Sequence, residues 1–104
     1  MTTTDEWIEF TYRDFYDLPR AIVLDYSGTL YMLDCPFDAE LDEYPEHYIV
    51  YRLPHDLRGV LATINWQDLP VRGERVGQVN IRDVDFDPTR RRAIHSRLFH
   101  SLKL

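Results

Sequence analysis

The chain has 104 residues, 44% of them hydrophobic and 29% charged, with a net charge of −6 and a single cysteine. This length fits one domain, 1–104, with a frayed polar start over 1–6. One cysteine excludes an internal disulfide, and no apolar run is long enough to indicate a membrane span. The opening MTTTDEW lacks the basic and apolar regions of a secretory signal, so we expect a cytoplasmic protein.

The two halves of the chain carry opposite charge. Residues 1–50 contain 12 acidic residues (Asp and Glu) and 2 arginines. Residues 51–104 contain 6 acidic residues and 10 basic residues (Arg and Lys). Such a division bears on partners and on self-association rather than on the fold. The negative net charge disfavours nucleic acid as a partner, because phosphate contacts need a basic surface.

The first third of the sequence predicts three strands. The alternation of side chains from Trp7 to Tyr12 is typical of a strand, and Asp17–Arg20 interrupts it with a proline. Ala21–Asp25 and Leu30–Leu33 are apolar and flank a Ser-Gly turn in which Gly28 can supply a positive φ. These two segments therefore predict a hairpin.

The middle of the chain is an acidic loop followed by further strands. Asp34–His47 (DCPFDAELDEYPEH) is polar and contains two prolines, which predicts a loop with one helical turn in it. Tyr48–Leu53 predicts a strand. Gly59–Trp66 alternates and contains β-branched residues, so we interpret it as a strand, although its apolar spacing also suits a helix. Val76–Phe86 predicts a strand with a bulge at Arg82-Asp83.

The end of the chain predicts a helix. Asp87 is an N-cap acceptor followed by a proline, and Ile94, Leu98 and Leu102 repeat at four-residue intervals. We therefore expect a helix over 87–102, cap included. The fold class is then α+β: a curled, small-barrel-like antiparallel sheet of five or six strands, with the C-terminal helix packed on it.

One short motif suggests catalysis. The segment AIVLDYSGTLY, residues 21–31, resembles motif I of the haloacid dehalogenase-like phosphohydrolases, in which an apolar strand ends in D-x-D-G-T-L. The resemblance implies that Asp25 is the phosphorylated nucleophile of a Mg²⁺-dependent enzyme and that residues 28–30 fill the loop. Ser27 stands where the phosphatases have a second Asp as general acid.

The remainder of the chain favours the hairpin interpretation of this motif. The family also needs a downstream Ser or Thr, a Lys or Arg, and a carboxylate pair, placed on a parallel doubly wound sheet. The only lysine is Lys103, near the end, and the segments after the motif lack the helices that parallel crossovers require.

The acidic loop is the main candidate for a binding surface. A cation site would use its carboxylates, but their spacing does not match an EF-hand and no glycine provides the sharp turn. Carboxylates interleaved with aromatic rings suit a basic protein partner better. The candidate binding residues in this segment are Asp34, Phe37, Asp38, Glu40, Asp42, Glu43, Tyr44 and Glu46.

A second candidate region is the basic run Arg90, Arg91 and Arg92. In the first turn of the expected helix these cations lie at the end that already carries partial positive charge. We expect them to pair with nearby carboxylates within the chain; an external anion is the alternative. Cys35 has acidic neighbours that oppose thiolate formation, so we interpret it as structural.

Apart from the motif around Asp25, no residue pattern indicates a catalytic centre, a metal site or a cofactor. The sequence therefore predicts a small non-enzymatic protein-binding domain, of the inhibitor, immunity or antitoxin type, that recognises a basic partner through an acidic and aromatic surface. The alternatives are a metal-dependent phosphohydrolase-like protein that uses Asp25, and a self-associating structural protein in which the acidic half of one copy meets the basic half of another.

Overall fold

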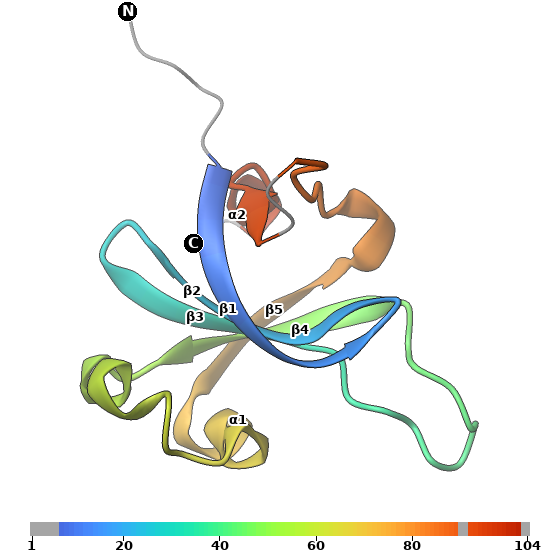
Figure 1. Cartoon of the computed structure of the whole chain (residues 1–104), viewed down its shortest axis with the longest axis horizontal. Coiled ribbons are helices and arrows are strands. Elements are labelled where there is room, and N and C mark those ends of the chain that lie inside the picture. Colours follow the sequence, from blue (N-terminus) through green and yellow to red (C-terminus); the bar gives the residue numbers. More distant parts are fainter. Residues whose placement is uncertain (1–6, 90–91, 103–104) are drawn as a thin grey trace, which may run out of the picture.

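The computed structural model describes residues 7–89 and 92–102 (Figure 1). Its centre is a six-stranded antiparallel sheet with the strand order β5-β4-β3-β2-β1-β6. In chain order the elements are β1 (Trp7–Tyr16), β2 (Leu18–Tyr26), β3 (Thr29–Asp34), β4 (His47–Leu53), the 3₁₀ helices η1 (His55–Val60) and η2 (Trp66–Asp68), α1 (Leu69–Arg72), β5 (Glu74–Asn80), the 3₁₀ helix η3 (Ile81–Asp83), β6 (Ala93–His95) and α2 (Leu98–Ser101).

The prediction of an antiparallel sheet is confirmed, whereas the barrel-like closure is wrong. β5 and β6 form opposite edges of the sheet, and among the described residues no strand pairing joins them. The central hairpin is as expected: β2 and β3 pair from Ala21↔Asp34 to Tyr26↔Thr29, and Gly28 adopts φ 79° in the turn. The described chain contains no helix with the length and apolar character needed to cross a membrane.

Both faces of the sheet are covered, which explains the continuous apolar runs in its central strands. Along β2, Ile22 and Leu24 belong to one core cluster, and Ala21 and Val23 to the other. Figure 1 shows the C-terminal elements over one face and η1, η2 and α1 over the opposite face. Because successive side chains of a strand point to opposite faces, a strand buried on both sides needs a continuous apolar run.

The long C-terminal helix predicted over 87–102 is wrong. Ala93–His95 instead form the edge strand β6, which pairs with the beginning of β1, and only Leu98–Ser101 are helical. Asp87 caps no helix among the described residues: its carboxylate accepts from the Thr89 amide at 2.8 Å in a turn. The apolar stripe is buried as expected, because a short strand followed by one helical turn also points Ile94 and Leu98 into the core.

Two further strand predictions need correction. Gly59–Trp66 is not a strand: the chain forms η1 and a series of turns, and the Val60 side chain is exposed. The strand predicted over Val76–Phe86 ends at Asn80, and the phase change at Arg82-Asp83 is the 3₁₀ turn η3 rather than a bulge.

Candidate protein-binding surface

A surface at one end of the sheet brings together the β1–β2 turn and the loop between β3 and β4 (Figure 1). β1 and β2 are joined through Asp17, which adopts a left-handed backbone with φ 64°, so that Tyr16 pairs with Leu18. Aspartate adopts the left-handed backbone conformation more readily than most residues do. Tyr16 is therefore held beside a tight turn, and its ring stacks on Tyr44 of the loop at 5.5 Å between centroids.

The tip of the acidic loop is a small hydrogen-bonded hairpin. The Asp38 and Glu43 backbones bond each other in both directions, at 2.9 and 3.2 Å. The Asp38 carboxylate accepts from the amides of Glu40 and Leu41 at 3.0 and 3.2 Å, and Asp42 adopts φ 55°. Asp is suited to both positions because its short side chain bonds nearby amides and tolerates the left-handed region. The loop therefore presents its side chains from a defined backbone.

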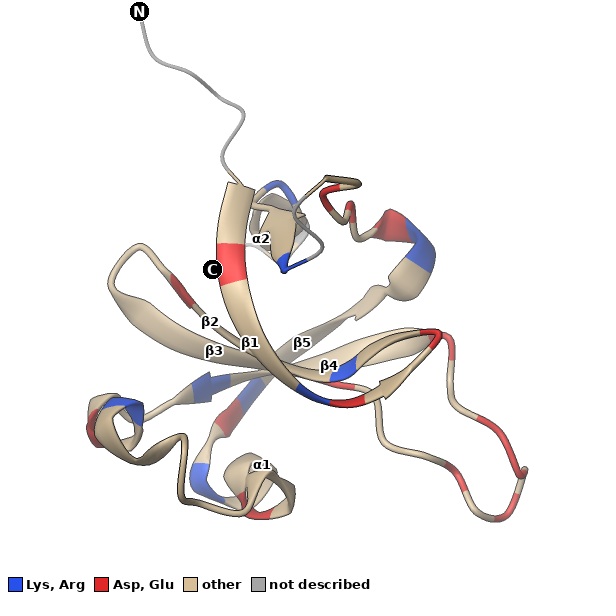
Figure 2. Ribbon diagram, viewed as in Figure 1, with Lys and Arg blue, Asp and Glu red and all other residues tan. Residues whose placement is uncertain are grey.

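Carboxylates are concentrated at this tip (Figure 2). Glu40, Asp42 and Glu43 are exposed, and Asp38 is half-buried. None of them has an ion-pair partner among the residues that the structure describes, where the ion pairs lie on other elements. The tip thus carries negative charge that is free to attract a basic molecule. We call these four residues the tip carboxylates: Asp38, Glu40, Asp42 and Glu43.

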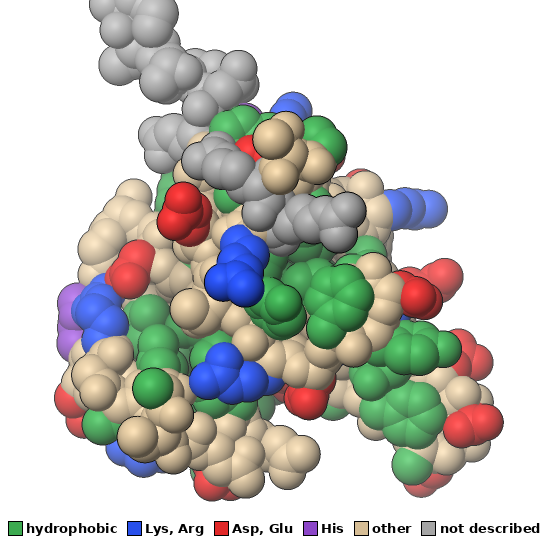
Figure 3. Space-filling view, in the orientation of Figure 1, with side chains coloured by type: hydrophobic (Ala, Val, Ile, Leu, Met, Phe, Trp, Pro, Cys, Tyr) green, Lys and Arg blue, Asp and Glu red, His purple; other side chains and the backbone are tan. Residues whose placement is uncertain are grey.

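Aromatic rings lie in the loop that carries the tip carboxylates and at the adjoining end of β1. The rings of Phe37 and Tyr44 meet edge-to-face, with 5.1 Å between their centroids, and Tyr44 stacks on Tyr16. The ring centroids of Phe15 and Tyr12 are 5.9 Å apart. Phe15 is 61% exposed, Tyr16 60% and Phe37 50%. Figure 3 shows hydrophobic side chains gathered with acidic ones on the projecting lobe. We call the tip carboxylates, together with Phe15, Tyr16, Phe37 and Tyr44, the acidic–aromatic surface.

Arg20, on β2, connects the loop to the sheet beneath the acidic–aromatic surface. It is only 9% exposed and has no carboxylate partner among the described residues. Its Nε donates to the Tyr16 carbonyl at 3.0 Å and its Nη1 to Cys35 Sγ at 3.5 Å, while the guanidinium lies 4.2 Å from the Tyr44 ring centroid. A planar guanidinium can stack and donate in its plane at the same time. Arg20 therefore connects β1 with the start and the end of the loop.

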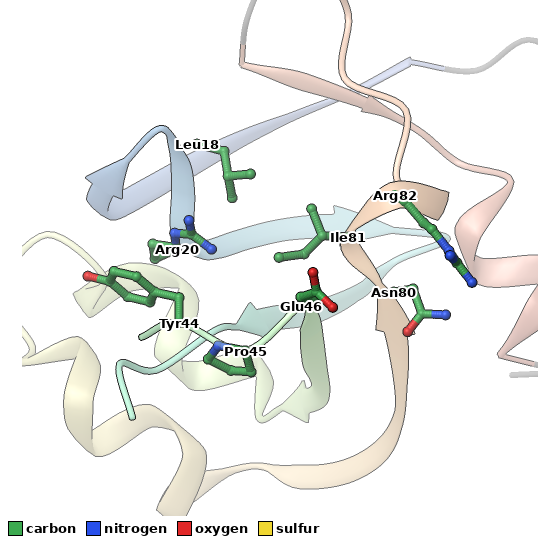
Figure 4. Close-up of a pocket in the computed structure, with 8 residues that line it drawn as sticks. All are labelled: Leu18, Arg20, Tyr44, Pro45, Glu46, Asn80, Ile81 and Arg82. Carbon is green, nitrogen blue, oxygen red and sulfur yellow. The ribbon is translucent and has the colours of Figure 1, made fainter. Parts of the chain in front are cut away.

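Arg20 and Tyr44 also form one end of an open hollow of about 470 Å³. Figure 4 shows them side by side, with Glu46 in the middle of the hollow and Asn80 and Arg82 at the other end. Positive and negative side chains alternate along this hollow, so it does not have the uniform charge that would select an ionic ligand.

We expect Arg20→Lys to destabilise the protein by about 1–3 kcal/mol, because lysine keeps the charge but loses the planar stacking on Tyr44 and the Nε bond to Tyr16. Urea unfolding measures this change. The nuclear Overhauser contacts between the two tyrosine rings should weaken in the same variant. Unchanged stability and unchanged ring contacts would show that Arg20 does not hold the loop.

Cys35 and Tyr48 complete the buried base of the loop. Cys35 Sγ lies 3.3 Å from the Pro45 carbonyl, and the Tyr48 hydroxyl donates to the Pro19 carbonyl at 2.5 Å. Burial raises the pKa of the Cys35 thiol, and the hydrogen bond from Arg20 offsets only part of that effect. Burial also raises the pKa of Tyr48. Both groups are therefore neutral near pH 7, which agrees with the structural role predicted for Cys35.

A second cavity of about 450 Å³ lies on the opposite side of the loop base, between the sheet and η2. Asp34, at the end of β3, and Asp14, on β1, both line it. Burial first, and the Asp14 carboxylate second, raise the pKa of Asp34 to about 6. Neither aspartate has an ion-pair partner among the described residues.

The raised pKa of Asp34 has a consequence for stability. The folded protein holds this proton more tightly than the unfolded chain does, so stability should fall as pH rises from about 4 to about 6. We expect Asp34→Asn to stabilise the protein at pH 7 by on the order of 1 kcal/mol, allowing for solvent screening of a partly exposed group. The gain should disappear at pH 4, where Asp34 is protonated in the folded state. Urea unfolding of both proteins at the two pH values checks this; an equal effect at both would contradict it.

The structure places the remaining predicted site residues as follows. Glu46 is exposed beside the acidic–aromatic surface. Arg90 and Arg91 lie outside the described residues. Arg92 precedes β6 instead of lying in a helix, and its guanidinium is 5.7 Å from the Tyr12 ring.

Sequence reasoning missed four contributors to this region: Asp14, Phe15, Tyr16 and Arg20. Asp14, Phe15 and Tyr16 belong to a strand pattern, and only pairing with β2 brings that strand end to the acidic loop. The alternation of acids and aromatics in DFYD, residues 14–17, is the one local feature that resembles the loop and could have indicated them.

Asp25 lies in a setting unlike that implied by the phosphohydrolase resemblance. It is in the antiparallel β2–β3 hairpin, opposite Leu30, and not at the end of a strand in a parallel sheet. Arg58 donates to its carboxylate from Nε at 2.9 Å and from Nη2, and also contacts the Gly28 carbonyl. Within the described ranges, no cluster of three His, Cys, Asp or Glu side chains could hold a metal ion.

In comparisons with protein families, curated proteins and solved structures, no match to this chain was found. The functional interpretation therefore depends on the geometry and chemistry of the surface itself.

Proposed function

We propose that this protein is a non-enzymatic binding domain that recognises a basic protein through the acidic–aromatic surface. The observation that carries the proposal is the placement of half-exposed rings beside carboxylates that lack partners among the described residues. Aromatic side chains provide most contact energy at protein interfaces, and unpaired charge gives steering and selectivity. An inhibitor, immunity or antitoxin type of protein fits this description.

Two features of the surface suit recognition of a folded partner. Arg20 and the turn formed by Asp38 hold the rings and carboxylates on a defined backbone, which lowers the entropic cost of binding. The exposed rings also form a contiguous group, since Phe37, Tyr44 and Tyr16 contact one another in series. Contiguous exposed apolar surface with a polar rim is typical of interaction sites.

A second copy of the chain is the alternative partner, and it would need free basic side chains in the second half. In the described part of that half, three arginines form ion pairs with the chain's own carboxylates: Arg52–Glu74, Arg58–Asp25 and Arg97–Asp85. Arg72, Arg75, Arg82 and Arg92 form none with the described residues, so the oligomeric state of the protein separates the two kinds of partner.

The experiment is a nuclear magnetic resonance titration of the labelled protein with a nonapeptide of arginine, at low and at high salt. We expect shift changes to concentrate at the acidic–aromatic surface and to disappear at high salt, since exposed charges are screened. Changes concentrated on another part of the molecule, such as the acidic segment 83–87, would overturn the proposal.

A further inference from the structure

The cavity between the sheet and η2 combines negative charge with aromatic walls. Asp14 and Asp34 provide two carboxylates, while Phe37, Tyr44 and Trp66 provide rings. Its volume of about 450 Å³ can accommodate a long side chain. Phe37 and Tyr44 also belong to the acidic–aromatic surface, so the cavity adjoins the region where a partner would dock.

The charges around this cavity favour a cation. Arg20 also lines it, but that guanidinium is already engaged by Tyr16, Cys35 and the Tyr44 ring. Asp14 and Asp34 both line the cavity, and neither carboxylate has an ion-pair partner among the described residues. Two adjacent carboxylates repel each other unless one takes up a proton or a cation lies between them.

Rings of this region already stack with guanidinium groups of the chain itself. Arg13 lies with its Cζ 4.5 Å from the ring centroid of Trp66, and Arg20 stacks on Tyr44. Rings and carboxylates together are the chemistry that recognises arginine and lysine side chains, through the ring face and through charge-assisted hydrogen bonds.

We propose that this cavity receives a lysine or arginine side chain of the partner, with Asp34 and Asp14 binding its charged end and Phe37 and Tyr44 flanking its stem. This inference rests on the proposed function, because it specifies which part of a basic partner enters the surface and where. In the absence of the partner, Asp34 is an unpaired carboxylate that costs stability, as is common for groups kept for binding.

The first test uses small probes that represent one side chain. N-acetyl-arginine amide and N-acetyl-lysine amide are titrated into the labelled protein, with N-acetyl-citrulline amide as the neutral counterpart of arginine. We expect at least one basic probe to shift the Trp66 indole and the Asp34 resonances at millimolar concentrations, and citrulline to leave them unchanged. Equal shifts with citrulline, or no shift with either basic probe, would overturn the inference.

The second test compares variants in their affinity for the arginine nonapeptide. Asp34→Asn conserves side-chain volume and is expected to weaken binding about tenfold. Asp56→Asn removes one exposed charge on η1, outside the surface, and should change affinity less than twofold. Because Asp34→Asn is expected to stabilise the fold, weaker binding cannot be explained by unfolding.

A third protein separates this inference from the proposed function. In the tip variant, the tip carboxylates are replaced by amides: Asp38→Asn, Glu40→Gln, Asp42→Asn and Glu43→Gln. If the tip variant loses binding while Asp34→Asn binds normally, the cavity inference is wrong and the proposed surface stands. If the wild-type protein does not bind the nonapeptide at this surface, the proposed function itself is wrong.

Discussion

The tip variant is expected to bind the arginine nonapeptide about 100-fold more weakly than the wild-type protein, since each exposed charge contributes roughly 0.5–1 kcal/mol to such an attraction. The fold should be retained. An asparagine at position 38 would still accept hydrogen bonds from the backbone amides of residues 40 and 41. Asparagine also tolerates the positive φ found at Asp42. Isothermal titration calorimetry measures the affinity, and circular dichroism the fold.

A charge-matched variant is the control for this prediction. It neutralises four exposed carboxylates elsewhere that form no ion pair among the described residues: Glu9→Gln, Asp56→Asn, Asp68→Asn and Asp83→Asn. Its net charge equals that of the tip variant. If binding depends on the local surface, this variant keeps most of its affinity. If both variants lose affinity equally, the nonapeptide senses only net charge and the surface assignment fails.

The second large effect concerns Trp66, which anchors the segment between β4 and β5 on its face of the sheet. Trp66 is buried in the core cluster that contains Ala21 and Val23, and its Nε1 donates to the Leu61 carbonyl at 2.9 Å. We expect Trp66→Ala to destabilise the protein by about 3–5 kcal/mol, through lost burial, a cavity and an unpaired carbonyl. Urea unfolding followed by circular dichroism gives the value.

Two companion variants make this result specific. Trp66→Phe keeps a ring but loses the hydrogen bond, so its cost should be about 1–2 kcal/mol. Val71→Ala lies on α1 in the same segment, but Val71 is 87% exposed, so the change should stay within about 0.5 kcal/mol. A cost below about 1 kcal/mol for Trp66→Ala would mean that this segment is not packed on the sheet.

Those parts of the fold that depend on neighbours in sequence could be predicted. The β2–β3 hairpin was foreseen because the turn and both apolar segments lie within residues 21–33. The C-terminal segment was not, because Ala93–His95 pair with Trp7–Glu9, more than eighty positions earlier. An apolar spacing that suits a helix also suits a short strand and one helical turn, and only this distant pairing selects between them.

The candidate surface could be predicted only where its residues lie in one segment of the sequence. Phe37 and Tyr44 could be identified because they lie among the carboxylates of one segment. The contributions of Tyr16 and Arg20 could not, because both come from the β1–β2 hairpin and reach the loop only in the folded sheet. Asp34 was named as a candidate, but the cavity that it shares with Asp14 depends on how β1, β2 and β3 pair in the sheet.

The most direct test of the central claim is affinity capture from the native lysate at low and high salt, with mass spectrometry of the eluted proteins. The wild-type protein, the tip variant and the charge-matched variant serve as baits. The proposal predicts one dominant basic protein, captured at low salt by the wild type and the charge-matched variant, released at high salt and not captured by the tip variant. Equal capture of that protein by all three baits, or no basic protein with any of them, would contradict recognition through the acidic–aromatic surface.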